Sequence, residues 1–340
     1  MDAIMLSRAD LEQTHLLTEK LQHVGAVVHL AAINRHARDS EILTTNVQLA
    51  HNLAVALEAI DHRVTLVHGN SIHCGDPSAF GQSKLKVREL FHRRLQGHTF
   101  VDVLLPNLFG EHGVPNYNSF VATFCHALVN GREPTVFDDR EVPLLHAQDA
   151  ADILIEGCTR ETDGDIRPTA ESHLISDILG NLKTYGRGYA DGEVPDTSSV
   201  FKRALFNTFR SYLVMETSNY APQVHADSRG SLFEAIRANG GPFQAFASHT
   251  QPGQTRGQHF HRRKFERFVV LEGSASITMR RLFGTEIRQV SVGGSQPTVV
   301  DMPTLWAHAI TNVGDSDLIT LFLTDSHFDH AAPDTYPEVV

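Results

Sequence analysis

The segment GQTRGQHFHRRKFERFVVLEG, residues 253–273, decides how half of this chain is interpreted. It places His259 and His261 two positions apart, and Glu266 follows after a short basic stretch. Alternate side chains of a β-strand share a face, so the two histidines point the same way if this segment is a strand. The segment therefore predicts part of a metal site.

A second segment, PTLWAHAITN at 303–312, supplies His308 on a later strand. Three imidazoles and a carboxylate form a good ligand set for a divalent transition metal, most simply Zn²⁺. An HxH pair alone is a weak signal in a chain with 21 histidines, whereas two half-motifs with matched spacing are specific. The alternative is that these are surface histidines of an ordinary β-sandwich.

The sequence around these half-motifs has an all-β pattern, with short apolar runs separated by Gly, Asp and Asn turns. The expected strands are Phe268–Leu271, Ala275–Met279, Ile287–Val292, Thr298–Val300 and Leu318–Leu323. Together with the metal half-motifs, this pattern resembles the cupin barrel, a double-stranded β-helix. The resemblance implies that the histidines point into the barrel.

The first half of the chain alternates strands with helices, which predicts a parallel sheet covered by helices. The expected strands are Val24–Leu30, Val64–His68 and Phe100–Leu105. The expected helices are Asp39–Ile60, Gly81–Leu95 and Phe120–Val129, with further candidates at Leu174–Leu182 and Phe201–Leu213. Such sheets bind ligands beyond the carboxyl ends of their strands.

Composition narrows the class of protein. A chain of 340 residues is long enough for two domains, and a formal net charge of −11 argues against nucleic acid as a partner. The three cysteines are scattered and predict reduced thiols in a cytoplasmic protein. We find no signal peptide or membrane-spanning run in the sequence, so no membrane partner is expected.

The chain resembles the two-domain capsular-polysaccharide enzymes of the CapF family from about residue 24 to its end. The segments that carry the resemblance, besides the two metal half-motifs, are VVHLAAINR (27–35), Asn46, FGQSK (80–84), PNLFG (106–110), PNYNSFVATFCHALVNG (115–131), DSRGSLFE (227–234) and PDTY (333–336). They occur in the same order as in the family.

The resemblance implies an α/β plus all-β protein. Residues 1–215 would be an incomplete Rossmann-like domain of the extended short-chain dehydrogenase/reductase type, and 216–340 a cupin domain. The family acts on a UDP-linked 4-keto-6-deoxy-N-acetylhexosamine: the cupin domain epimerises C3, and the reductase domain then reduces the C4 ketone with NADPH. Cupin barrels commonly bury an open edge against a second copy, so a homodimer is expected.

The N-terminal half departs from the family at its start. The family begins with a strand and a GxxGxxG turn, whose glycines let the pyrophosphate of the cofactor approach a helix N-terminus. No such turn precedes Val24 in this sequence, and Ala3–Leu6 is expected to be a remnant of the family's second strand. NADPH binding is therefore doubtful, and either the first strand and helix have been lost or the true start lies upstream.

A second departure concerns the catalytic tyrosine. The family's YxxxK becomes Phe80 to Lys84 here, so the tyrosine that protonates the reduced carbonyl is absent. Loss of a general acid typically costs about 10²–10⁴-fold in rate. Ser71 corresponds to the family's catalytic serine and Lys84 is kept, but both are equally compatible with inherited structure at the end of a sheet.

Several residues are candidates for binding the sugar nucleotide. In PNLFG and PNYNS, these are Asn107, Asn116, Tyr117 and Asn118, although Asn and Pro are also common in turns. In the metal half-motif, Arg256 and Lys264 are candidates for binding the diphosphate or a developing enolate, or they face solvent.

Four functions remain open from sequence. The first is a metal-dependent sugar-nucleotide C3-epimerase whose reductase half is weakened or lost. The second is a full epimerase and NADPH-dependent reductase with a start upstream of Met1. The third is a non-catalytic paralogue that binds a sugar nucleotide, and the fourth is an iron-dependent cupin oxygenase, since the ligand set alone does not exclude iron.

Overall fold

The computed structural model describes residues 3–190, 192–213, 219–228 and 230–340. The chain forms two compact units. The first comprises Met1–Leu108 and Val142–Ser172, and the second Phe109–Glu141 and His173–Val340. The second unit thus includes residues 109–141 and 173–215, which lie before the boundary expected after residue 215.

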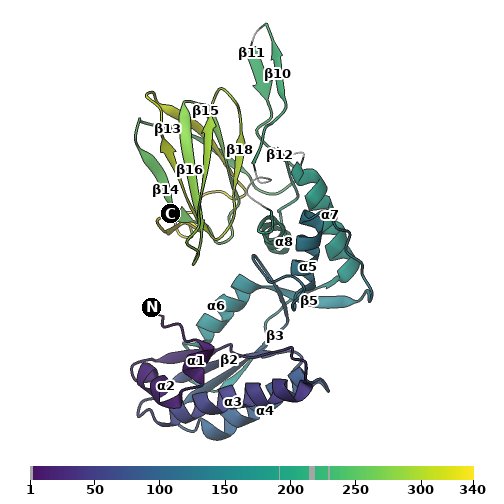
Figure 1. Ribbon diagram of the computed structural model, residues 1–340, viewed down its shortest axis with the longest axis vertical. Helices are drawn as coiled ribbons and strands as arrows, with labels where there is room; N and C mark the ends of the chain where they lie inside the picture. The colour runs from purple at the N-terminus through teal and green to yellow at the C-terminus, as the bar shows by residue number, and fades with distance from the viewer. Residues whose placement is uncertain (1–2, 191, 214–218, 229) are drawn as a thin grey trace. The chain divides into compact units, whose positions relative to one another are not determined.

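The first unit is built on a parallel sheet with strand order β1-β2-β3-β6 (Figure 1). Its strands are β1 (Ala26–His29), β2 (Thr65–Ser71), β3 (Thr99–Leu105) and β6 (Gly164–Ile166). Short strands β4 (Asn107–Phe109), β5 (Glu141–His146) and β7 (Glu171–Leu174) form a separate sheet in the order β4-β5-β7.

Helices cover both faces of the parallel sheet, as its apolar strands require. The helices are α1 (Arg8–Leu11), α2 (Thr14–Leu21), α3 (Asp39–Glu58), α4 (Ala79–Arg94) and α6 (Ala147–Gly157). Leu66 and Phe100 pack with α3 and α4 in one apolar cluster, whereas Val67 and Val101 pack with α6 in another. Successive side chains of each strand point to opposite faces of the sheet, so each strand contributes to both apolar clusters.

A buried row of polar side chains crosses the same sheet. His29, His68 and Asp102 are successive register partners on β1, β2 and β3, and all three are buried. His68 Nδ1 lies 2.9 Å from Asp102 Oδ1, and Arg88 from α4 lies 3.2 Å from Asp102 Oδ2. Burial lowers the pKa of His68 to about 4, although its hydrogen bond to Asp102 opposes this shift. The ring is therefore neutral at pH 7.

The expectation of a strand remnant at Ala3–Leu6 is wrong. These residues lie outside any strand, and the following residue, Ser7, is the N-cap of α1. The Ser7 side chain accepts a hydrogen bond from Asp10 N, and the Asp10 carboxylate accepts one from Ser7 N, which is a capping box. The helix start is thus specified locally, and in the described part of the chain β1 is an edge strand.

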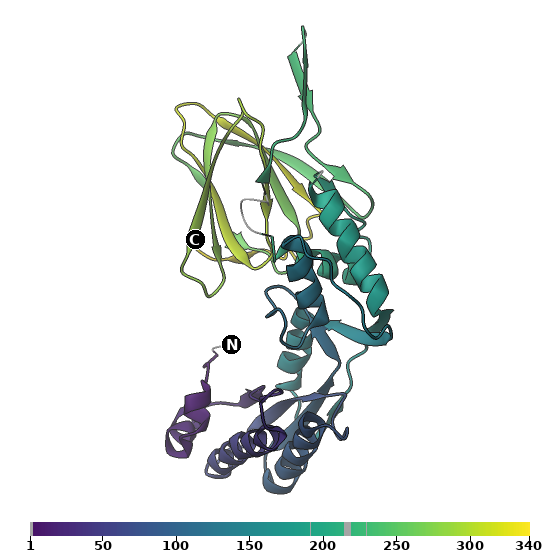
Figure 2. The ribbon, with the colours of Figure 1, turned by 45° about the vertical axis from the view of Figure 1, so that its right-hand side comes forward.

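The second unit contains two five-stranded antiparallel sheets that face each other (Figure 2). One has the order β13-β20-β15-β18-β9 and the other β17-β16-β19-β14-β21. The strands of the first sheet are β9 (Asn219–Tyr220), β13 (Gln244–Thr250), β15 (Glu266–Glu272), β18 (Val299–Met302) and β20 (Leu318–Thr324). Those of the second are β14 (Thr255–Phe260), β16 (Ser274–Arg281), β17 (Ile287–Gly293), β19 (Trp306–Asn312) and β21 (Tyr336–Pro337).

Residues from both sheets form one apolar core, in which Phe268, Ile277 and Ile310 are buried. Two smaller strand pairs complete the unit. Strand β8 (Glu193–Val194) pairs with β12 (Arg237–Ala238), and β10 (Val224–Asp227) pairs with β11 (Gly230–Phe233) in a hairpin that extends beyond the barrel in both ribbon views (Figures 1 and 2).

Helices α5 (Phe120–Val129), α7 (Ile175–Ala190) and α8 (Val200–Arg210) belong to this unit, and α8 packs on the barrel. Arg210 at the end of α8 makes a bidentate ion pair with Asp301 on β18, at 2.9 and 2.7 Å. Tyr189 from α7 donates a hydrogen bond to the same carboxylate. All three side chains are buried, so the barrel and these helices share one polar interior network.

The expected fold class, a Rossmann-like parallel sheet followed by an antiparallel barrel, is confirmed. Among the residues described, none of the helices has the length and apolar character needed to span a bilayer.

Candidate functional site

The barrel brings together the four residues of the two half-motifs. His259 lies near the end of β14, His261 just beyond it, Glu266 begins β15, and His308 is on β19. One potential ligand atom from each lies within 4.8 Å of all the others. Two half-motifs far apart in sequence thus converge on one point inside the barrel, as the spacing predicted.

A β-bulge aims His259 at this point. Strands β14 and β19 pair in regular register as far as Gly257, opposite Ala309, and the register then shifts so that His259 lies opposite His308. Gly257 and Gln258 have positive φ angles of 98° and 59°. Directly opposed residues share a face of an antiparallel pair, so the extra residue turns His259 toward the same side as His308.

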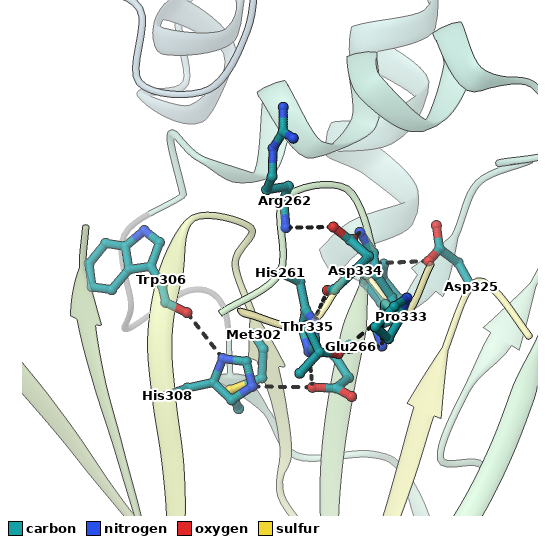
Figure 3. A network of polar contacts seen from close by, with 12 residues as sticks. His261, Arg262, Glu266, Met302, Trp306, His308, Asp325, Pro333, Asp334 and Thr335 are labelled. Carbon is teal, nitrogen blue, oxygen red and sulfur yellow. Dashed lines mark hydrogen bonds and ion pairs between the residues drawn. The ribbon is translucent and has the colours of Figure 1, made fainter. Parts of the chain in front are cut away.

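Main-chain carbonyls fix the orientation of two of the imidazoles (Figure 3). His261 Nδ1 donates to Asp334 O at 2.6 Å, and His308 Nδ1 donates to Trp306 O at 3.1 Å. A carbonyl oxygen can only accept, so each neutral ring carries its proton on Nδ1. The lone pair of each Nε2 then faces the centre of the cluster, which is the arrangement found in metal-binding histidines.

The centre of the cluster is therefore crowded with acceptors. Oε2 of Glu266 lies 3.0 Å from His261 Nε2 and 3.2 Å from His308 Nε2. Nε2 of His308 is buried without a hydrogen-bond partner. A carboxylate and two imidazole nitrogens can approach this closely with either a proton between them, as in the 3.0 Å hydrogen bond of His261 Nε2 with Glu266, or a metal ion, so the residues present fit a divalent metal.

The surroundings of Glu266 and His259 shift their pKa values toward the protonation states that can bind a metal. Burial alone would raise the pKa of Glu266, but when His261 and His308 also carry a proton on Nε2, their hydrogen bonds and positive charge outweigh burial and hold that pKa well below the usual carboxyl range. Burial, followed by the neighbouring His308 and His261, lowers the pKa of His259 to about 4. At neutral pH the cluster thus offers an ionised carboxylate and an uncharged His259.

The four side chains of the cluster differ in exposure. His261, Glu266 and His308 are each less than 10% exposed, whereas His259 is half-buried. The ring of Phe268 lies 5.7 Å from that of His308 and begins the apolar interior of the barrel. His259 is therefore the most exposed of the four potential ligands.

Comparison with known proteins agrees with this architecture. Residues 225–336 match the family described as Polysaccharide biosynthesis C-terminal domain. Over 329 residues the chain is 28% identical to the UDP-2-acetamido-2,6-beta-L-arabino-hexul-4-ose reductase of Pseudomonas aeruginosa, covering 94% of this chain and 87% of that one. The crystal structure of CapF, the capsular polysaccharide assembling protein of Staphylococcus aureus, aligns with a TM-score of 0.54 at 27% identity, covering 98% of this chain and 90% of CapF.

The chain is similar to CapF in sequence and fold over nearly its whole length. The likeness to CapF spans both halves of the chain, so it includes the residues expected to bind the sugar nucleotide and those expected to remain from the reductase site.

Lys264 lies in the loop between two of the metal-site residues and is buried. Its Nζ donates to Pro333 O at 3.3 Å and to Thr335 Oγ1 at 3.4 Å, so it is tied to the PDTY segment. Its charge contributes to the lowered pKa of His259, after burial and the other two histidines. Lys264 therefore influences the metal site electrostatically, and substrate binding by it stays a prediction.

Arg256 is exposed, and binding of an anion by it stays a prediction. Its Nε donates to Thr250 Oγ1 at 2.9 Å, and its Nη2 donates to His249 O at 3.0 Å. Both acceptors lie on β13, in the opposite sheet, so Arg256 links the two sheets at the edge of the barrel.

The asparagines proposed for sugar-nucleotide binding lie in turns or at strand ends. Asn107 begins β4, and its Nδ2 donates to Pro143 O at 3.4 Å. Asn116, Tyr117 and Asn118 are exposed, and Asn116 has a φ of 57°, a left-handed conformation that Asn tolerates well. Asn116 N donates to Thr123 Oγ1 on α5. Contacts of these four residues with a ligand remain predictions.

Ser71 and Lys84, the two residues expected to remain from a reductase site, both make hydrogen bonds within the protein. Lys84 is buried, and its Nζ donates to Gly69 O at 2.7 Å and lies 5.7 Å from the centre of the Phe80 ring. Burial lowers the pKa of Lys84 to about 8. Ser71 Oγ accepts a hydrogen bond from His73 N. The lysine ammonium thus faces a phenyl ring at the position where the resemblance to CapF puts a tyrosine hydroxyl.

Sequence reasoning missed the residues that orient the ligands. Asp334 and the carbonyl of Trp306 hold two imidazoles, yet a main-chain carbonyl leaves no mark in a sequence. The PDTY segment contains Asp334 and was noted only as a point of resemblance. The buried pair His68 and Asp102 was also missed, although His29 and His68 interrupt two apolar strands in the same way.

Proposed function

We propose that this protein is a metal-dependent sugar-nucleotide epimerase that inverts C3 of a UDP-linked 4-keto-6-deoxy-N-acetylhexosamine during surface polysaccharide biosynthesis. The observation that carries the proposal is the inward-facing set of His259, His261, Glu266 and His308. The name of the Pseudomonas relative supports the substrate class, because it denotes a UDP-linked 4-keto-2-acetamido-2,6-dideoxy sugar.

Epimerisation next to a ketone moves one proton and leaves the oxidation state unchanged. A base removes the proton from C3, the electron pair of that bond forms the enolate of the C4 ketone, and a proton then returns to the opposite face. When bound, a divalent metal supplies Lewis acidity toward the ketone oxygen. The substrate would reach the site beside His259, the half-buried member of the cluster.

The chain's own residues prepare this chemistry by fixing geometry before the substrate arrives. The carbonyls of Asp334 and Trp306 hold the rings of His261 and His308 with their Nε2 atoms inward. The apolar interior that begins at Phe268 limits access of water to the site. Glu266 contributes the single negative charge among the four ligands.

We also propose that reduction at C4 is weakened or lost. Phe80 offers no proton to a developing alkoxide, and the Lys84 ammonium donates to the Gly69 carbonyl. The Pseudomonas relative, which aligns over 94% of this chain, is named a reductase. In this chain we infer that the N-terminal unit serves mainly as scaffold or substrate cradle.

The proposal is tested by metal content and activity together. Purified protein reconstituted with Zn²⁺ and freed of excess metal should carry one equivalent by elemental analysis, and epimerisation of the 4-keto UDP-sugar should rise in proportion to that content. His259→Ala should lower both. Protein that holds no stoichiometric metal and is unchanged by His259→Ala would falsify the proposal.

A further inference from the structure

The loop that joins two metal-site residues is held by carboxylates along its whole length. Residues 262–265 connect His261 to Glu266, and their four consecutive N–H groups all donate to aspartates. Asp334 accepts from residues 262, 263 and 264 at 3.2, 2.9 and 2.7 Å, and Asp325 accepts from Phe265 at 2.8 Å. Hydrogen bonds to an ionised acceptor are roughly twice as strong as neutral ones.

Asp334 holds the metal site in a second way. Its main-chain carbonyl accepts the 2.6 Å hydrogen bond from His261 Nδ1, while its carboxylate binds the loop that follows that histidine (Figure 3). One residue therefore fixes both the orientation of the His261 ring and the path of the backbone toward Glu266. Asp334 itself has a φ of 46°, a conformation that Asp adopts more readily than most residues.

The rest of the C-terminal segment contacts the other side of the same half-motif. Strand β21 pairs with the end of β14, so that Pro337 lies opposite His259 and Tyr336 lies opposite Phe260. The rings of Tyr336 and Phe260 stack with centroids 5.2 Å apart. Residues 334–337 thus contact both histidines of the HxH pair.

We propose that Asp334 is a positioning residue of the metal site and that metal affinity depends on this C-terminal segment. The inference rests on the metal binding of the proposed function. The reason is geometric: the ligand loop follows a path set by acceptors on a different part of the chain, so loss of those acceptors lets His261 and Glu266 separate. Outer partners of metal ligands typically contribute about 10–100-fold to metal affinity.

The test compares Asp334→Ala and Asp334→Asn with the matched control Asp329→Ala. Asp329 is exposed, lies in the same C-terminal segment and accepts a main-chain hydrogen bond from Ala331, and within the described part of the chain none of the four N–H groups of the ligand loop donates to it. Zn²⁺ affinity is measured by competition with a chromophoric chelator. The visible spectrum of the Co²⁺-substituted protein reports ligand geometry, which a purely structural role would leave unchanged.

We expect Zn²⁺ affinity to fall about 10–100-fold in Asp334→Ala, with an altered Co²⁺ spectrum, and to match wild type in Asp329→Ala. If Asp334→Ala does not fold, Asp334→Asn carries the test, because it keeps the shape and one oxygen acceptor while losing the charge. Wild-type affinity and an unchanged spectrum in a folded Asp334 variant would overturn the inference alone. A wild-type protein that takes up no metal would overturn the proposed function as well.

Discussion

His259 and His308 are direct cross-strand partners on β14 and β19, and they are partners only because of the bulge at Gly257 and Gln258. Continued without the shift, the earlier register would place His259 opposite Ala307, on the other face of the sheet. The position of His259 in the proposed metal site thus depends on one extra residue in a strand.

Gly257→Ala is expected to weaken metal binding and lower stability. A Cβ at this position would lie 2.7 Å from His308 O and 3.0 Å from Ala309 Cα, and the φ of 98° is strained for any residue other than glycine. Such a conformation alone costs on the order of 1–3 kcal/mol. Zn²⁺ affinity and the urea midpoint are the measurements.

The matched control is Gly253→Ala, in the turn before β14. Gly253 also has a positive φ, of 74°, but a Cβ there would meet nothing within 4 Å. It therefore carries the backbone strain without the collision with the His308 carbonyl. Equal loss of Zn²⁺ affinity in the two variants would contradict a special role for the bulge.

Glu266→Gln should bind metal far more weakly than wild type, because it removes the only negative charge in the cluster while keeping the shape of the side chain.

Chelation should lower the thermal midpoint of the wild type, since metal at about 100 times its Kd stabilises the folded state by about 2.7 kcal/mol. Trp306, the single tryptophan, reports on the site by fluorescence because its carbonyl holds His308.

Glu272→Gln is the control for Glu266→Gln. Glu272 ends the same strand, β15, but its side chain is exposed. Its metal affinity and its response to chelator should match those of wild type. A midpoint in Glu266→Gln that still rises with Zn²⁺ to the wild-type extent would argue against ligation by Glu266.

Acid should destabilise the N-terminal unit through His68. Its pKa is about 4 in the folded protein against 6.5 for an unperturbed histidine, so the unfolded chain binds the additional proton as pH falls. The contribution of His68 to the free energy of unfolding is fully present above pH 6.5, declines between pH 6.5 and pH 4, and does not change further below pH 4. The loss from this one residue is on the order of 3 kcal/mol.

His68→Asn should flatten this pH dependence, because an amide can still donate to Asp102 but does not titrate. Urea unfolding followed by circular dichroism between pH 7 and 4 measures the effect. The control is His23→Asn at an exposed position, which should keep the wild-type slope. An unchanged slope in His68→Asn would show that other groups carry the acid sensitivity.

Asp301→Asn should strongly destabilise the second unit. The substitution leaves Arg210 buried without its ion-pair partner and removes the nearest anion from the fully buried Arg267, 3.7 Å away. Removing one member of a buried pair typically costs about 3–5 kcal/mol. Urea unfolding followed by Trp306 fluorescence should show this loss.

Asp196→Asn breaks an exposed ion pair with Lys202 and should have little effect, since such pairs are screened by solvent. If the two variants have similar urea midpoints, the buried network that joins α8 to the barrel does not determine the stability of this unit.

Much of the architecture could be predicted from sequence because local patterns and packing agree. The helix expected at 120–129 and the strands expected near 100–105 and 318–323 occur within one residue of those bounds. The four metal-site residues were predicted because their spacing encodes alternation on strands. Gly257 inside a strand was the available signal for the bulge, since glycine in a strand often marks one.

Other features depended on contacts between distant parts of the chain. Helix α7 extends to Ala190, well beyond the expected end at Leu182, because Tyr185 and Tyr189 are buried in contact with Phe206 of α8. Asp334 acts through two groups: its own main-chain carbonyl accepts from His261, and its carboxylate accepts from three N–H groups about 70 positions earlier in the chain. Spacing within one segment carries no information about such contacts.

The most direct test of the account is proton exchange at C3. The 4-keto UDP-sugar is incubated with metal-replete protein in D₂O, with and without NADPH, and followed by NMR. We predict that deuterium enters at C3 without NADPH, that chelation stops it, and that NADPH adds little 4-hydroxy product. No exchange at C3 under either condition would contradict the account, and rapid formation of a 4-hydroxy sugar with NADPH would contradict the inferred loss of reduction at Phe80.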